Sequence, residues 1–221
     1  MKAPWALRAA GALLVALPML IATPASAQLL GGQMTNLLGN ASDSALDKLS
    51  QPGAFYKDKA VRILLPGPLK KASKIMKFTD KAGITNGLVE KLNAAAGLAA
   101  KEAKPIFRSA ISQITLRDTV GIVGKGDGAT RYLRESSGEV LQTKMRPLIA
   151  SALGEVGAFD QLDKLGKSSA LLGQAGLSRD GLTDSVTSQA LDGIFTYMGN
   201  EEGRLRANPL GALMSATKRG N

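Results

Sequence analysis

The stretch that decides the fold runs from residue 88 to residue 107 and reads LVEKLNAAAGLAAKEAKPIF. Its apolar residues recur every three or four positions, which predicts a helix that packs closely on its neighbours through small side chains. This stripe consists of Leu88, Leu92, Ala95, Ala96 and Ala99. Pro105 breaks the helix because proline has no amide hydrogen for the helical ladder. A second helix is predicted directly afterwards from Ile106, Phe107, Ala110, Ile111 and Ile114.

Helical patterns continue towards the C-terminus. Short helices are predicted over residues 115–123 and 129–135, separated by a glycine-rich loop at 124–128. A longer helix follows, kinked at Pro147, and an amphipathic helix is expected over 160–172. The apolar face of the longer helix is formed by Leu141, Met145, Leu148, Ala152 and Val156. A further strong stripe consists of Leu182, Val186, Ala190, Leu191, Ile194, Phe195 and Met198.

The segments before residue 88 are less regular. Residues 28–40 are apolar, uncharged and rich in glycine, which indicates a loosely packed arm. A short helix over 42–49 is expected next, capped by a polar side chain at its start. Residues 60–65 are expected to be extended and residues 68–78 helical, with a proline in the first turn.

These patterns predict an all-α fold, a single bundle-like domain of about seven to nine helices. No alternating strand pattern of comparable length competes with them. The predicted organisation is a signal peptide at 1–27, an N-terminal arm with a short helix at 28–54, and the all-α domain at 55–221.

The N-terminus has the three-part pattern of a secretory signal peptide. Lys2 and Arg8 supply the positive region, residues 9–21 an apolar run, and residues 23–27 a small-residue end of the A-x-A type. The apolar run is shorter than the roughly 20 residues of a membrane-spanning helix, which disfavours the alternative of an uncleaved anchor. We predict cleavage after Ala27 and export to the periplasm.

The chain contains no histidine and no cysteine. This composition excludes disulfides, thiolate nucleophiles and imidazole general bases, together with Ser-His and Cys-His catalytic arrangements. Metal sites built from histidine or cysteine are excluded as well. We therefore name no catalytic residue, metal or cofactor and favour a protein without enzymatic activity, although carboxylates, arginines and tyrosines remain available for chemistry.

Positive charge is concentrated between residues 57 and 81, which hold eight basic residues against Asp58 and Asp80. Part of this segment has helical spacing, so several of its lysines share a face. The face is either a solvated surface or a contact for an anionic partner, such as envelope lipids or polymers; nucleic acid is a poor partner for an exported protein. The candidate contacts are Lys70, Lys71, Lys74, Lys77 and Lys81.

A second candidate site is a polar pocket between helices. The loop at 124–128 lacks the spacing of a P-loop and the acidic ligands of a calcium loop, which favours a plain connection between helices. Polar residues around this loop and further along the chain can nevertheless converge on one cleft. These candidate ligand contacts are Asp118, Asp127, Arg131, Tyr132 and Asp192. The alternative role of Asp118 is to cap the start of a helix.

Asp192 lies within the last apolar stripe, so we expect it to be largely buried. An unpaired buried charge is costly, and we therefore expect an arginine partner, either Arg131 or Arg134. The role is then an internal ion pair or, alternatively, part of a polar pocket.

The segment 201–206 contains two glutamates followed by two arginines. Spacings of three and four residues allow ion pairs along one side of a helix. We interpret the segment as a solvated helix face.

Six short blocks occur along the chain in a recognisable order. They are residues 60–63 (AVRI), 102–107 (EAKPIF), 115–118 (TLRD), 126–132 (GDGATRY), 190–195 (ALDGIF) and 201–209 (EEGRLRANP). In this order, over about residues 50–214, they resemble the bacterial family known as domain of unknown function 4197. The N-terminal part departs from it, because the helix before Phe55 looks shortened. The resemblance implies export and a helical domain, and it implies no established reaction.

Two functions from different classes follow. The first is a non-enzymatic, envelope-associated binding or structural protein of the periplasm. The second is an enzyme or small-ligand receptor that uses a carboxylate, arginine and tyrosine pocket between helices. The positions of the pocket candidates in space distinguish these two functions, because convergence on a cleft favours the enzyme or small-ligand receptor.

Overall fold

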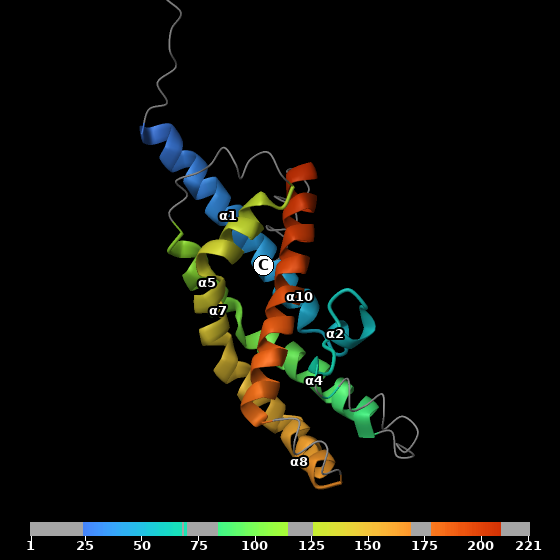
Figure 1. Cartoon of the computed structure of the whole chain (residues 1–221). Helices are drawn as coiled ribbons and strands as arrows, with labels where there is room; N and C mark the ends of the chain where they lie inside the picture. Colours follow the sequence, from blue (N-terminus) through green and yellow to red (C-terminus); the bar gives the residue numbers. More distant parts are fainter. Residues whose placement is uncertain (1–23, 68, 70–83, 115–125, 169–177, 209–221) are drawn as a thin grey trace, which may run out of the picture.

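A computed structural model describes residues 24–67, 69, 84–114, 126–168 and 178–208. Within these ranges the chain forms seven helices and no strand (Figure 1). The helices are α1 (Pro24–Leu49), α2 (Ala54–Lys57), α4 (Ile84–Glu102), α5 (Lys104–Ser112), α7 (Gly128–Glu155), α8 (Ala158–Ser168) and α10 (Arg179–Ala207). The prediction of an all-α, multi-helix fold is confirmed.

Helix α10 is the central element of this arrangement. Figure 1 shows it, coloured orange to red, running beside α7, and it packs extensively on α1 as well. Apolar residues at every fourth position form its buried core row: Leu182, Val186, Ala190, Ile194 and Met198. An exposed row with the same spacing runs along another side: Asp184, Ser188, Asp192, Thr196, Asn200 and Arg204.

The stripe predicted for the segment around residue 92 is confirmed in α4. Its five members are buried, with exposed fractions of at most 2%. Small residues let α4 approach the end of α1, since a Cβ atom on Gly97 would lie 3.5 Å from the carbonyl oxygen of Leu49. The predicted break is also present, because α4 ends at Glu102 and Pro105 lies in the first turn of α5.

The interpretation of residues 28–40 as a loosely packed arm is wrong. Helix α1 is continuous from Pro24 to Leu49, and Met34 and Leu38 belong to the hydrophobic core. Tertiary packing therefore stabilises a segment whose glycines and lack of charge gave little local helical signal. The predicted cleavage site after Ala27 falls in the first turn of α1, and residues 1–23 lie outside the described residues.

The two helices expected between residues 129 and 156 are one helix. Helix α7 runs without interruption from Gly128 to Glu155, with Pro147 in its interior. Leu133 and Leu141, on either side of the expected gap, are both fully buried in the same core. Burial of this continuous face outweighs the local preference for a break at the polar and glycine residues between them.

Two carboxamide side chains hold the non-helical segment that follows α2. The buried Asn93 of α4 accepts from the N–H of Ile63 (2.8 Å) and donates to its carbonyl oxygen (2.9 Å). Gln189 of α10 does the same for Leu64, at 2.8 and 3.0 Å. Each carboxamide thus satisfies both backbone groups of one residue, as a neighbouring strand would.

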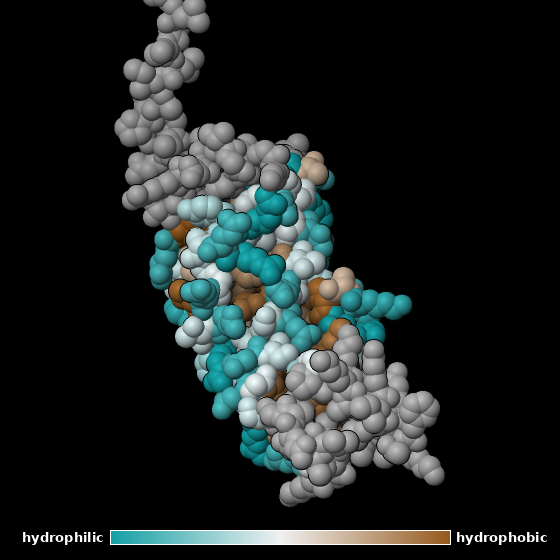
Figure 2. Space-filling model, viewed as in Figure 1, coloured by the Kyte–Doolittle hydropathy of each residue, from teal (hydrophilic) through white to brown (hydrophobic). Residues whose placement is uncertain are grey.

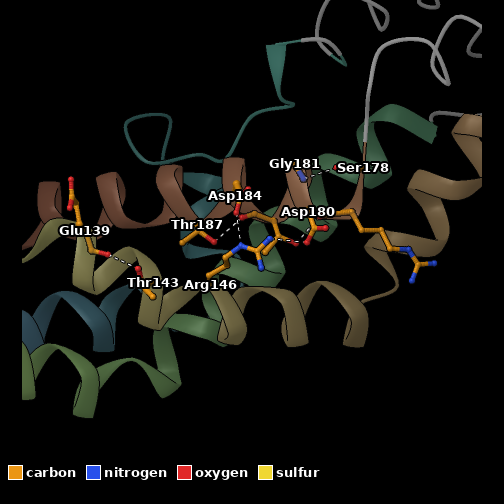
Figure 3. A network of polar contacts seen from close by, with 10 residues as sticks. Glu139, Thr143, Arg146, Ser178, Asp180, Gly181, Asp184 and Thr187 are labelled. Carbon is orange, nitrogen blue, oxygen red and sulfur yellow. Dashed lines mark hydrogen bonds and ion pairs between the residues drawn. The ribbon is translucent and has the colours of Figure 1, made fainter.

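Ion pairs fasten the start of α10 to α7. In Figure 3, Arg146 of α7 lies between Asp180 and Asp184 of α10, and it donates to them at 2.8 and 2.6 Å. Ser178 caps α10, since its Oγ accepts from the N–H of Gly181 at 3.0 Å. These ionic side chains are exposed, so the pairs orient the helix end and contribute little to stability.

The surface in Figure 2 is mostly hydrophilic over the middle of the molecule, with hydrophobic residues in small separate patches. None of the described helices has the length and apolar character needed to span a membrane. The predicted lysine face at 70–81 and the helix predicted at 115–123 lie outside the described residues, as does nearly all of the helix predicted at 68–78.

A tight contact at Gly193 allows α10 to pack against the segment around α2. A Cβ atom on Gly193 would lie 3.0 Å from Cε1 of Phe55 and 3.2 Å from Cβ of Val61. We expect Gly193→Ala to lower the free energy of unfolding by about 1–3 kcal/mol, because these buried side chains must shift. Urea denaturation measures the change.

Gly138→Ala is the matched control, because Gly138 lies inside α7 with no neighbouring atom within 4 Å of the added Cβ. Alanine has the higher helix propensity, so this variant is expected to gain up to about 1 kcal/mol. Equal stabilisation by both substitutions would contradict the tight contact at Gly193.

Candidate functional site

A buried carboxylate joins the start of α7 to α10. Glu202 is fully buried. Its two oxygens accept from the N–H groups of Ala129 (3.0 Å) and Thr130 (2.7 Å). Arg206, one turn further along α10, donates to the same carboxylate from Nε (2.9 Å) and Nη2 (2.7 Å). Because Asp127 makes no side-chain capping bond, Glu202 caps α7 from another helix.

Glycines let the turn before α7 approach α10 closely at this junction. A Cβ atom on Gly199 would lie 3.3 Å from Cβ of Asp127, and one on Gly203 would lie 3.7 Å from the carbonyl oxygen of Gly126. The turn that precedes α7 therefore rests almost directly on the backbone of α10. Larger residues at these positions would push the turn away from Glu202.

The neighbouring Glu201 ties α10 to α1. It is 5% exposed and accepts from Ser44 Oγ (3.0 Å) and Lys48 of α1, and from Arg204 Nη2 (2.7 Å). Burial alone would raise the pKa of Glu201, but the hydrogen bonds from Lys48, Arg204 and Ser44 outweigh it and hold the pKa below its usual value. Glu201 is therefore ionised at neutral pH.

A cleft of about 610 Å³ opens beside the Glu202 junction. One wall is the start of α7 with the preceding turn, and the other is the part of α10 from Phe195 to Gly203. We call it the α7–α10 cleft. Its lining residues are Gly126, Asp127, Thr130, Arg131, Arg134, Phe195, Thr196, Gly199, Asn200 and Gly203.

Two arginines supply positive charge to the α7–α10 cleft. Arg131 has a half-exposed side chain, and its Nε lies 3.9 Å from the carboxylate of Asp127, beyond hydrogen-bond distance. Arg134 lies over the ring of Phe195, 5.5 Å from its centroid, and pairs with Asp192. Arg134 is thus fixed by two contacts, whereas the guanidinium of Arg131 is available to a ligand.

Thr130 adds a polar group that nothing in the described chain satisfies. The residue lines the cleft and is 3% exposed, and its Oγ1 has no hydrogen-bond partner among the described residues. A buried hydroxyl without a partner costs about 1–3 kcal/mol. A buried polar group without a partner in the wall of a cleft calls for an explanation, and a functional role of the cleft is one.

The structure brings some of the predicted pocket residues together. Asp127 and Arg131 line the α7–α10 cleft, and Asp192 adjoins it through its ion pair with Arg134. Tyr132 lines a different hollow, of about 420 Å³, between α5 and α7. The cause is helical geometry, because Tyr132 is rotated by about 100° from Arg131. Asp118 lies outside the described residues.

The expectation that Asp192 is buried is wrong. Its side chain is 55% exposed, although the predicted partner Arg134 does pair with it. Asp192 belongs to the exposed row of α10, one position beyond the buried Leu191. A helix packed around most of its circumference places apolar and solvent-facing residues side by side in sequence.

The interpretation of segment 201–206 as a solvated helix face is also wrong in part. The ion pairs at three- and four-residue spacing are present, between Glu201 and Arg204 and between Glu202 and Arg206. Both glutamates are nevertheless buried. The partners that make burial possible are backbone and side-chain groups far away in sequence, on α1 and α7.

Sequence reasoning did not name several residues of the cleft, among them Thr130 and Asn200. The spacing of Arg131 and Arg134 could have indicated that both side chains belong to one site, since residues three apart share a face of a helix. No such signal exists for Thr130, whose hydroxyl is recognisable as unsatisfied only in three dimensions. Among the described residues, no group of three or more acidic side chains is arranged to hold a metal ion.

Replacing Glu202 tests the junction. Glu202→Ala leaves Arg206 without its carboxylate and two buried N–H groups without an acceptor. We expect the free energy of unfolding to fall by about 3–5 kcal/mol, the range for breaking a buried ion pair, as measured by urea denaturation.

Glu139→Ala is the control, because Glu139 is an exposed residue of α7 whose side chain makes no hydrogen bond or ion pair in the network of Figure 3. Its effect is expected to stay within about 0.5 kcal/mol. If the two variants lose equal stability, Glu202 does not anchor α7.

Replacing Asp192 gives a much smaller effect. The Asp192–Arg134 pair is exposed on both sides, and exposed pairs contribute about 0–1 kcal/mol. We expect Asp192→Ala to change the free energy of unfolding by less than about 1 kcal/mol in the same assay. A loss as large as that of Glu202→Ala would contradict the exposed position of Asp192.

Comparison with known proteins identifies a family for this chain. The model of the family described as "Protein of unknown function (DUF4197)" matches residues 25–217. The match includes α1, so the N-terminal departure expected from the resemblance is not supported. Neither the comparison with curated proteins nor that with solved structures gives a match. The chain, matched over nearly its whole length, belongs to the DUF4197 family.

Proposed function

We propose that this protein binds a small ligand in the α7–α10 cleft, with Arg131 contacting an anionic group of that ligand. The observation that carries the proposal is the buried, unsatisfied hydroxyl of Thr130 in the same cleft as Arg131. A scaffold that needed apolar packing alone would have no reason to keep both groups. Guanidinium groups are suited to carboxylates because their planar donors match two oxygens at once.

The position of the cleft supports a binding role. Its walls are held by Glu202, which fixes α7 on α10, and by Arg134, which is fixed by Phe195 and Asp192. A rigid frame lowers the conformational entropy that a ligand must offset when it binds. Arg131 is therefore presented by a preorganised surface.

The cellular setting remains a prediction from the sequence. The signal-peptide pattern favours a periplasmic protein, and the lysines between residues 70 and 81 favour an anionic envelope partner. Both features can coexist with a ligand site, because they concern other parts of the chain. A binding protein without enzymatic activity is our preferred interpretation, and an enzyme that uses the same cleft is the alternative.

A thermal-shift screen tests the proposal. The purified protein is heated with small carboxylates, phosphates, amines, amino acids and neutral sugars. A ligand at a hundred times its Kd stabilises by about 2.7 kcal/mol, which for a domain of this size raises the Tm by roughly 5–10 °C. We expect at least one compound that carries an anionic group to raise the Tm of the wild type and to have no such effect on Arg131→Gln.

Arg108→Gln is the matched control for this screen. Arg108 is also exposed and paired with an aspartate, but it lies on α5 and does not line the cleft. Its variant should keep the full thermal shift. The proposal fails if no compound raises the Tm, or if Arg131→Gln responds as strongly as Arg108→Gln.

A further inference from the structure

The charges of the α7–α10 cleft indicate what kind of small molecule it takes, given the function proposed above. Asp127, Arg131 and Arg134 line the cleft, and Asp192 pairs with Arg134 at its edge. These four side chains carry two positive and two negative charges. A simple anion therefore gains from Arg131 and loses against Asp127, so the cleft has no net attraction for it.

Asp127 and Arg131 are neighbours that do not satisfy each other. They lie one helical turn apart, with 3.9 Å between Nε and Oδ1, and each side chain is about half exposed. A hydrogen-bonded guanidinium and carboxylate approach to about 2.7–2.9 Å. The pair is thus open, and both groups keep hydrogen-bonding capacity for a third partner.

The remaining polar groups of the cleft are uncharged. The hydroxyl of Thr130 is buried in the wall of the cleft, and Asn200 contributes a carboxamide from the exposed row of α10. The intervening wall consists of Gly126, Gly199 and Gly203, which have no side chains to fill the space. This wall has room for the short body of a ligand and carries no charge.

We infer that the ligand is a small zwitterion of the α-amino acid type. Its carboxylate pairs with Arg131, and its ammonium group pairs with Asp127. The two charged groups of an α-amino acid are separated by a single carbon atom, which matches the close spacing of Asp127 and Arg131. A zwitterion gains from both charges of the cleft, whereas an anion or a cation gains from one and is repelled by the other.

Calorimetric titration with matched probes tests this inference. The full panel of L-amino acids is titrated into the protein, and each amino acid that binds is compared with its N-acetyl derivative and its methyl ester. The first derivative lacks the ammonium charge and the second lacks the carboxylate charge. We expect each derivative to bind more weakly on the order of 10- to 100-fold, the loss expected for one charged hydrogen bond.

Asp127→Asn gives the matching change on the protein side. The side chain of Asp127 is half exposed and makes no capping bond, so the variant is expected to keep the wild-type Tm. The variant should bind the amino acid more weakly by a similar factor, and it should bind the N-acetyl derivative at least as well as the wild type does, because Asp127 repels that anion. Arg131→Gln should instead weaken the binding of both the amino acid and its N-acetyl derivative.

The outcomes separate the inference from the proposed function. If N-acetyl derivatives or simple carboxylates bind as tightly as the amino acids, in an Arg131-dependent way, the cleft is a ligand site and the zwitterion inference is overturned. Normal binding of amino acids by Asp127→Asn would overturn the zwitterion inference as well. If no compound of the panel or of the wider screen binds, both the inference and the proposed function fail.

Discussion

The capping of α7 by the buried carboxylate of Glu202 is the interaction on which the rest of the structure depends. A buried charge must recover a desolvation cost of several kcal/mol, and Glu202 does so with two backbone N–H groups of α7 and the guanidinium of Arg206. Those partners exist together only when α7 starts at Gly128 against this turn of α10. The position of α7 on α10 is therefore specified by hydrogen-bond geometry. Because these two helices form the walls of the cleft, the shape of the cleft is fixed as well.

Apolar periodicity was sufficient to predict the helices that pack through one well-marked stripe, such as α4. It failed for α1, because Gly31, Gly32 and Gly39 weaken the local signal, while burial of Leu38 stabilises the helix from outside. Local propensity is a weak prior that packing overrides. For the same reason the polar stretch in the middle of α7 did not divide that helix in two.

The candidate site was predictable only in part. Asp127 and Arg131 were found because they are charged and surround a glycine-rich loop, a local signal. Asp192 was misjudged because α10 is enclosed on most sides, so buried and exposed residues alternate without a wide polar face. The buried state of Glu202 depends on groups more than seventy residues away, and no local pattern distinguishes such a glutamate from one in a solvated ion pair.

The two carboxamides that hold Ile63 and Leu64 have a consequence for the order of assembly. Asn93 belongs to α4 and Gln189 to α10, so the non-helical segment that follows α2 docks fully only after both helices are in place. The amide protons of Ile63 and Leu64 then become independent hydrogen-exchange reporters, the first for α4 and the second for α10. These two adjacent residues would record whether α4 and α10 open together or separately.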